Sequence, residues 1–178
     1  MLSYERWYAR MIHLFHGTNV VFDAIDPQKG RRGTDFGQGF YLTPNQESAK
    51  RMAQRVATRK GGDAVVMHYG IDDSCLSNGD LAVRQFPVID LAWLRFIVAN
   101  RYNVLSAAEH NLERRFDVVH GLVADDKVVQ ILDDLRNEMI SEAEALAKLR
   151  AAPYQTVQYS FHTDRAVAYL NRLEVVNV

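Results

Sequence analysis

The sequence predicts an α+β domain with a split, mainly antiparallel β-sheet and flanking helices. Short stretches that alternate apolar and polar residues, such as 156–162, are typical of half-buried strands. Longer stretches with helical spacing lie between them without strict strand–helix alternation, which argues against a doubly wound parallel sheet. The 178 residues are 48% hydrophobic, enough for one domain with its own core.

Seven stretches have the composition and period of β-strands. In the first of them, Ile12, Leu14 and His16 share one face, because side chains alternate along a strand. His13 and Phe15 then lie on the opposite face. The expected strands cover residues 11–16, 40–42, 64–71, 81–86, 116–123, 156–162 and 173–178.

Helices are expected where capping signals precede apolar residues at helical spacing. Thr43 and Gln46 form a capping box around Pro44, so a helix should begin there and end at Gly61. Its buried stripe is predicted to comprise Ala49, Met52, Ala53 and Val56. Further helices are expected over 2–10, 89–102, 107–115, 127–139, 142–152 and 163–170. We therefore expect a single domain, 1–178, with a helical elaboration at about 88–115 and 125–152.

Ser141 and Glu144 form a second capping box, and Thr163 is expected to cap the short helix near the end of the chain. The lone cysteine, Cys75, cannot form an intramolecular disulfide. No apolar run approaches the roughly 20 residues that span a bilayer, and the N-terminus lacks the apolar centre of a signal peptide. A cytoplasmic protein that does not bind membranes is the expectation.

The formal net charge is −1, so the whole chain gives no electrostatic reason to expect nucleic-acid binding. Basic residues nevertheless cluster in two strips, one before and one after the sequence Gly-Phe-Tyr-Leu-Thr at 39–43. The first strip contains Lys29, Arg31 and Arg32. The second contains Lys50, Arg51, Arg55, Arg59 and Lys60.

Several common functional motifs are excluded by their context. Gly37-Gln-Gly39 begins like a dinucleotide-binding fingerprint, but no third glycine follows and a strand comes next instead of a helix. No phosphate-binding loop is present. His13 and His16 fall on opposite strand faces, and His68, His120 and His162 are isolated in sequence, so no metal site is expected.

One set of residues fits the cleavage of the nicotinamide–ribose bond of NAD. Gly17 has no Cβ, so its backbone N–H and C=O can approach a flat carboxamide. Tyr41 offers an aromatic face for the nicotinamide ring. His16 and Thr18 flank Gly17 and can contact ribose hydroxyls, while Arg31 and Arg32 can meet the pyrophosphate; Lys29 lies beside them.

The order of these motifs resembles the histidine–tyrosine–glutamate branch of ADP-ribosyltransferases, the branch of diphtheria toxin and poly(ADP-ribose) polymerases. More closely, the chain resembles a bacterial family named only as a domain of unknown function and itself similar to that branch. The resemblance covers residues 12–175. It is carried by four blocks: 14–18, 35–43, 116–125 and 158–163.

The resemblance implies a role for each matching position. His16 becomes an adenosine-ribose contact, Gly17 the carboxamide clamp and Tyr41 the nicotinamide stack, with Phe40 among the NAD contacts. The branch usually places a glutamate at the third position, where this chain has Gln158. Glutamine can orient a hydroxyl but brings no negative charge, so transfer of a single ADP-ribose is expected in place of chain elongation.

A carboxylate elsewhere can supply the missing charge or act as a base on the acceptor, and Asp125 and Asp126 are the candidates. The implied function is an NAD-dependent mono-ADP-ribosyltransferase, a bacterial toxin or defence effector with NAD as co-substrate and no metal. Its acceptor is a protein or a nucleic acid, and an intracellular toxin would need a neutralising antitoxin protein.

Two other functions stay open. The first is a catalytically inactive module that binds NAD or ADP-ribose on the same fold, with Gln158 marking lost catalysis. The second is an RNA-processing transferase that uses NAD as its acceptor; the basic strips allow it, whereas the net charge argues against a large RNA footprint.

Each candidate residue also has a purely structural explanation. Tyr41 can be a core aromatic residue, and His16 a hydrogen-bonded structural histidine. Gln158 can be a solvent-facing strand residue and Asp125 a helix cap. Asp35 can order the glycine-rich loop in which it lies.

Overall fold

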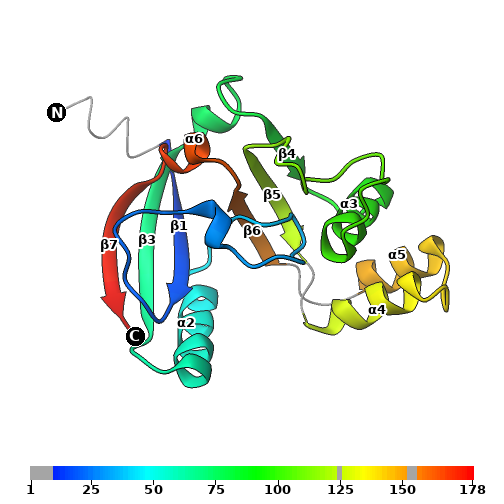
Figure 1. Ribbon diagram of the computed structural model, residues 1–178, viewed down its shortest axis with the longest axis horizontal. Coiled ribbons are helices and arrows are strands. Elements are labelled where there is room, and N and C mark those ends of the chain that lie inside the picture. Colours follow the sequence, from blue (N-terminus) through cyan, green and yellow to red (C-terminus); the bar gives the residue numbers. More distant parts are fainter. Residues whose placement is uncertain (1–9, 124–125, 152–155) are drawn as a thin grey trace.

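Two β-sheets form the centre of the molecule, and helices lie at their sides (Figure 1). The computed structural model describes residues 10–123, 126–151 and 156–178. The first sheet has three antiparallel strands in the order β1–β3–β7. These strands are β1 (Met11–Thr18), β3 (Val65–Asp72) and β7 (Asn171–Asn177).

The second sheet has four strands in the order β2–β6–β5–β4. Its strands are β2 (Phe40–Leu42), β6 (Thr156–Phe161), β5 (Val118–Val123) and β4 (Val83–Phe86). All neighbours are antiparallel except β4 and β5, which run parallel. The prediction of an α+β fold with a split, mainly antiparallel sheet is confirmed.

Among the described residues, one isolated β-bridge joins the backbones of the two sheets. Phe15 of β1 and Thr43, just after β2, exchange two backbone hydrogen bonds of 2.8 and 3.0 Å. We call the stretch where the end of β1 faces β2, residues 16–18 and 40–43, the seam. Because this isolated bridge is not continued, residues 16–18 of β1 and 40–42 of β2 form no ladder with each other.

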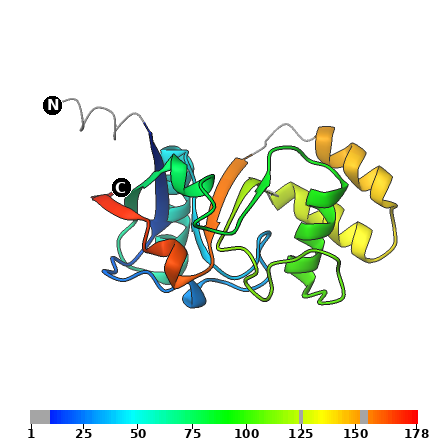
Figure 2. The same cartoon turned by 90° about the horizontal axis from the view of Figure 1, so that it is seen from above.

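Helix α2 (Gln46–Lys60) packs on the outer face of the three-stranded sheet, with Ala49 and Ala53 buried against it. Helices α3 (Leu91–Tyr102), α4 (Asp126–Arg136) and α5 (Glu142–Ala151) gather beyond the four-stranded sheet, on the side away from α2 (Figures 1 and 2). Shorter helical pieces are η1 (Pro27–Lys29), η2 (Asp73–Leu76) and α6 (Asp164–Val167).

The apolar core follows this division. One cluster packs α3, α4 and α5 onto the four-stranded sheet around Trp93, whose indole N–H donates to the carbonyl of Leu122 at 2.6 Å. A second cluster lies between the two sheets around Leu14, Phe40 and Phe161. Burial of these side chains, at roughly 25 cal/mol per Å² of apolar surface, is the main stabilising contribution.

Three helix predictions are wrong. Asn45, and not Thr43, caps α2, because Thr43 still belongs to the extended chain that bridges to Phe15. Met52 is 42% exposed, since α2 approaches the sheet closely only along its two alanines. Residues 107–115 form turns in place of a helix, because α3 ends in left-handed Asn103.

Other local predictions are confirmed. Ser141 and Glu144 exchange the hydrogen bonds of a capping box, at 3.3 Å for the Glu144 N–H and 2.8 Å for the Ser141 N–H. Gly61 ends α2 with φ 81°, and Thr163 caps α6. The expected helix at 2–10 lies outside the described residues. Among the described residues no helix is both long and apolar enough to cross a bilayer.

Candidate functional site

His16 joins the two strands of the seam through its side chain. Its Nδ1 lies 2.8 Å from the carbonyl oxygen of Tyr41. A carbonyl only accepts, so Nδ1 carries the proton and Nε2 presents a lone pair. Burial lowers the pKa of His16 and outweighs the opposite effect of this hydrogen bond. The imidazole is therefore neutral near pH 7, with Nε2 as an acceptor.

At Gly17, the backbone pairing of β1 with β2 that begins at the Phe15–Thr43 bridge does not continue. The Phe15–Thr43 bridge, if continued, would set Gly17 opposite Tyr41 and pair their backbones. Instead the Tyr41 carbonyl accepts from the His16 side chain. In an extended strand, residues two apart direct N–H and C=O to the same edge, so those of Gly17 face the seam. Among the described residues none hydrogen-bonds them on that edge.

The packing of α2 on β1 also requires a residue without a side chain at position 17. An added Cβ would overlap the carbonyl oxygen of Ala49 and lie 2.8 Å from the backbone nitrogen of Ala53. Glycine is thus required for the close approach of β1 to α2. That packing holds the strand, while the backbone N–H and C=O of Gly17 lie in the plane of the sheet and face the seam.

Tyr41 is fixed by its hydroxyl. The hydroxyl lies 2.7 Å from the Gly37 carbonyl and 2.9 Å from Thr34 Oγ1, and it accepts the Phe36 N–H at 3.1 Å. Burial raises the pKa of Tyr41, so the phenol stays protonated. Its ring lies parallel to that of Phe36, with centroids 6.5 Å apart. The ring position is therefore set by the loop before β2 rather than by a ligand.

Ser160 of β6 and His162, just after that strand, support Tyr41. Ser160 lies directly opposite Tyr41 in the sheet, and the ring of His162 meets the Tyr41 ring edge-on. His162 donates through Nδ1 to the Gln38 carbonyl at 2.9 Å, so its Nε2 accepts from the Ser160 hydroxyl at 2.7 Å. Burial lowers the pKa of His162 to about 4. This pair was not foreseen from the sequence, where His162 was set aside as isolated.

Gln158 lies on the same sheet face as Tyr41. Because Tyr41 pairs with Ser160, Gln158 is its diagonal neighbour two residues along β6, about 7–8 Å away in a regular sheet. Across β5 it faces Gly121, which offers no side chain. Gln158 is partly buried, and its amide makes no hydrogen bond to a described residue. The register of β2 and β6 thus places Gln158 and Tyr41 on one sheet face as diagonal neighbours.

The remaining candidates lie around the seam with different exposure. Thr18 accepts the Val20 N–H at 3.3 Å and turns the chain away at the end of β1. Arg31 and Arg32 are exposed on the loop before β2 and form no ion pair with a described residue. Phe40 is buried, with its ring centroid 4.6 Å from that of His16. It therefore has little surface to offer a ligand.

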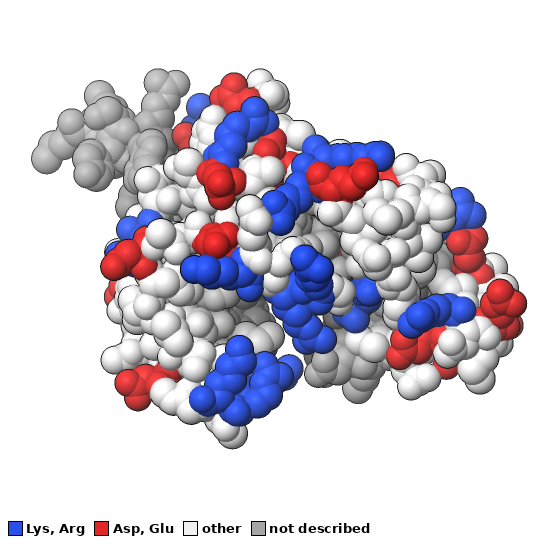
Figure 3. All heavy atoms as spheres, in the orientation of Figure 1, with Lys and Arg blue, Asp and Glu red and all other residues white. Residues whose placement is uncertain are grey.

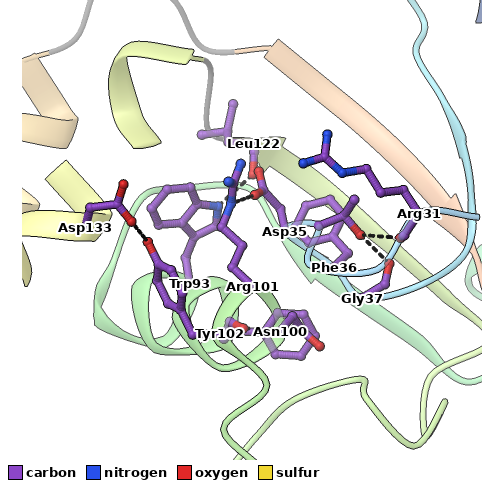
Figure 4. A network of polar contacts seen from close by, with 12 residues as sticks. Arg31, Asp35, Phe36, Gly37, Trp93, Asn100, Arg101, Tyr102, Leu122 and Asp133 are labelled. Atoms are coloured by element: carbon purple, nitrogen blue, oxygen red, sulfur yellow. Dashed lines mark hydrogen bonds and ion pairs between the residues drawn. The ribbon is translucent and has the colours of Figure 1, made fainter. Parts of the chain in front are cut away.

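A buried ion pair that the sequence did not reveal anchors the loop. Asp35 is 5% exposed and pairs with Arg101 in the last turn of α3, as Figure 4 shows. In the same view the Arg31 side chain takes part in no dashed contact. An acid between glycines was interpreted as loop-ordering, and that interpretation is confirmed. Its partner lies 66 residues away, so no local pattern could identify it.

Asp125 lies outside the described residues, and of Asp126 only the backbone at the start of α4 is described. His68 is not isolated: its Nε2 lies 2.8 Å from His13 Nδ1 across β1 and β3. Within the part of the chain that the structure describes, no group of three or more His, Cys, Asp or Glu side chains could hold a metal.

Comparison with known families gives one match. A model of the family described as "Protein of unknown function (DUF3990)" matches residues 12–172, nearly the whole chain. Searches among curated proteins and among solved structures give no match.

Proposed function

The chain belongs to the family of proteins of unknown function DUF3990, and from the geometry of its seam we propose that it is an NAD-dependent mono-ADP-ribosyltransferase. The observation that carries the proposal is that the backbone of Gly17 is not paired with that of Tyr41. A backbone N–H and C=O face an open edge there, beside Tyr41, and match the acceptor and donor of a carboxamide.

The other residues fit the rest of NAD. Tyr41 is only partly buried, and its hydroxyl holds the ring in place, which suits stacking on a nicotinamide. The neutral His16 can accept a ribose hydroxyl through Nε2. Arg31 and Arg32 are unpaired with described residues and can neutralise a pyrophosphate. This is the arrangement expected from the resemblance to the histidine–tyrosine–glutamate transferases.

The reaction is a substitution at the ribose carbon C1′. The bond from C1′ to the nicotinamide nitrogen breaks, and nicotinamide leaves with the electron pair. An acceptor oxygen or nitrogen forms the new bond to C1′ and releases its proton to solvent. Positive charge develops on the ribose, as in glycoside hydrolysis. Gln158 can hold a ribose hydroxyl through its free amide, but a neutral amide stabilises that charge less than a carboxylate does.

The acceptor is a macromolecule, and a toxin or defence effector with a neutralising partner is the biological role we propose. A test incubates labelled NAD with the protein and cell lysate, followed separately by protease, DNase or RNase. We expect label transfer that Tyr41→Ala and His16→Ala each abolish while Arg95→Ala, on the far helical side, retains it. Circular dichroism of each variant checks folding. If the parent neither binds nor consumes NAD with any acceptor, the proposal fails.

One observation favours a second function, an NAD- or ADP-ribose-binding module without turnover. The Asp35 carboxylate near Tyr41 is already paired with Arg101, and Gln158 is neutral. Under this alternative the parent binds NAD by calorimetry without consuming it, and Gln158→Ala leaves the affinity unchanged. Under the transferase proposal Gln158→Ala lowers the rate of NAD consumption.

A further inference from the structure

Thr43 hydrogen-bonds to strands of both sheets. Its backbone N–H donates to the Phe15 carbonyl at 3.0 Å, and its carbonyl accepts the Phe15 N–H at 2.8 Å. Its hydroxyl donates to the carbonyl of Val157 on β6 at 3.3 Å. The Thr43 side chain is buried. One residue therefore holds β1 through its backbone and β6 through its side chain.

This double role follows from the place where the ladder between β2 and β6 ends. The last pair of that ladder is Leu42 with Tyr159, so one further pair would set Thr43 opposite Gln158. The backbone of Thr43 pairs with β1 instead. Its hydroxyl still reaches β6, at the carbonyl of the peptide group that joins Val157 to Gln158. The hydroxyl thus holds the peptide group directly before Gln158.

The two strands that Thr43 connects carry the groups left open for a ligand. Gly17 lies on β1, two residues after Phe15, and directs its backbone N–H and C=O to the seam. Gln158 lies on β6, and its amide makes no hydrogen bond to a described residue. In the proposed reaction Gly17 holds the nicotinamide and Gln158 holds a ribose hydroxyl. The distance between these groups must therefore match two parts of one NAD molecule.

The described part of the site has little negative charge with which to stabilise a cationic ribose. Gln158 is neutral, and the Asp35 carboxylate near Tyr41 is paired with Arg101. Figure 3 shows a group of Lys and Arg side chains at the centre of the molecule, with the Asp and Glu side chains in view lying around this group. The rate should therefore depend strongly on proximity and orientation, where a displacement of about 1 Å can lower it about 100-fold.

We propose that Thr43 is a positioning residue, whose hydroxyl sets the distance between Gly17 and Gln158 and so places the ribose of NAD for the departure of nicotinamide. This inference rests on the proposed transferase function. Thr43 acts through Gln158 and not through a contact of its own with NAD. Loss of the hydroxyl should lower the rate more than the affinity for NAD, because α2 also holds Gly17 and the Tyr41 ring has its own hydrogen bonds.

The first experiment compares Thr43→Val, which keeps the shape of the side chain without the hydroxyl, with Thr43→Ser, which keeps the hydroxyl. NAD consumption at a fixed amount of cell lysate gives kcat and the KM for NAD. Calorimetry gives the fraction of each protein that binds NAD. We expect Thr43→Val to lower kcat about tenfold while KM changes by less than about twofold. Thr43→Ser should retain about half of the parental kcat or more.

The matched control is Thr58→Val on the exposed side of α2, where the hydroxyl likewise donates to a backbone carbonyl, that of Gln54 at 2.8 Å. It should keep the parental kcat and KM. A merely structural role of Thr43 would lower the fraction of protein that binds NAD and leave kcat per binding-competent molecule unchanged, which would overturn the proposal.

Thr43→Ser decides the question even where Thr43→Val does not fold, because the serine retains the hydroxyl that bonds Val157. A folded Thr43→Ser variant with the parental kcat supports the proposal. The same variant with a kcat about tenfold below that of the parent overturns it, since the hydroxyl would then not be the group that matters.

The second experiment tests whether Thr43 acts through Gln158. The kcat values of Thr43→Val, Gln158→Ala and the double variant are compared with that of the parent. Once the Gln158 amide is absent, its position no longer matters, so Thr43→Val should lower kcat by less than about twofold in the Gln158→Ala background. Two losses that multiply in the double variant would overturn the proposal.

These outcomes also separate the inference from the function on which it rests. If the parent consumes NAD and Thr43→Val keeps the parental kcat, the positioning role is overturned and the transferase stands. If the parent neither binds nor consumes NAD, the transferase is overturned and the role of Thr43 with it. A parent that binds NAD without consuming it has the same consequence for both.

Discussion

The two halves of the candidate site differ in how their polar groups are used. Around Tyr41, the hydroxyl, Ser160 and His162 all bond to other parts of the protein. Around Gly17 and Gln158, the backbone groups at the seam and the side-chain amide have no such partner among described residues. The first half is a rigid support, and the second half has the unsatisfied donors and acceptors that a ligand requires. Substitutions around Tyr41 should lower the free energy of unfolding, whereas substitutions around Gly17 and Gln158 should lower the affinity for a ligand.

The largest loss of stability is expected from Arg101→Ala. The substitution removes one member of a buried ion pair, which typically costs about 3–5 kcal/mol. Urea unfolding measures the effect. The matched surface pair Arg95–Glu142 should contribute less than about 1 kcal/mol, so Arg95→Ala is the control. Similar losses in both variants would show that the buried pair does not anchor the loop.

Lowering the pH should destabilise the half of the site around Tyr41, because His162 becomes protonated. Its folded-state pKa of about 4 lies below the ordinary 6.5, so between these values the unfolded chain binds more protons. The stabilisation is complete above pH 6.5 and is lost as the pH falls toward 4, by about 3 kcal/mol in total. Urea unfolding at several pH values tests this.

His162→Gln is the comparison variant, because it cannot titrate. The difference in unfolding free energy between parent and variant should shrink as the pH falls below 6.5. A difference that stays constant across this range would mean that His162 is not buried in its neutral form. Carboxylates and other histidines titrate in both proteins and cancel in the difference.

A smaller effect is expected from Tyr41→Phe. The ring remains, but the Phe36 N–H loses its acceptor, which costs about 1–3 kcal/mol. Tyr159→Phe is the control, because the Tyr159 hydroxyl makes no hydrogen bond to a described residue, and it should change stability by less than about 0.5 kcal/mol. The Tyr41→Phe variant keeps the ring but not the hydroxyl that holds it. Its affinity for NAD should therefore fall only to the extent that the ring becomes mobile.

The smallest change in stability is expected at Gln158, in the half of the site that also contains Gly17. Gln158→Ala removes no internal hydrogen bond to a described residue, so the unfolding free energy should shift by less than about 0.5 kcal/mol. NAD consumption should nevertheless fall at least tenfold. Gln158→Glu should raise it, because a carboxylate stabilises the developing positive charge. A large stability loss with unchanged turnover would assign Gln158 to the rigid half.

Most strands and helices, and the face on which Gln158 lies, could be predicted from local periodicity. Alternation in 156–162 set Gln158 and Ser160 on one face, and the short strand at 40–42 was predicted with its observed bounds. These features follow from local periodicity, which the backbone imposes on each segment. The prediction that Thr43 begins α2 failed, because the bridge to Phe15 keeps Thr43 extended.

The contacts that hold β1 and β2 apart at the candidate site could not be predicted in this way. The Asp35–Arg101 pair and the His16–Tyr41 hydrogen bond join residues distant in the chain, and no local pattern specifies such partners. The split at Gly17 likewise arises from two contacts at once, the packing of α2 on one side and the His16 side chain on the other. Hydrogen bonding and close packing depend on atoms brought together by folding, so residue types alone could not predict the geometry of the candidate site.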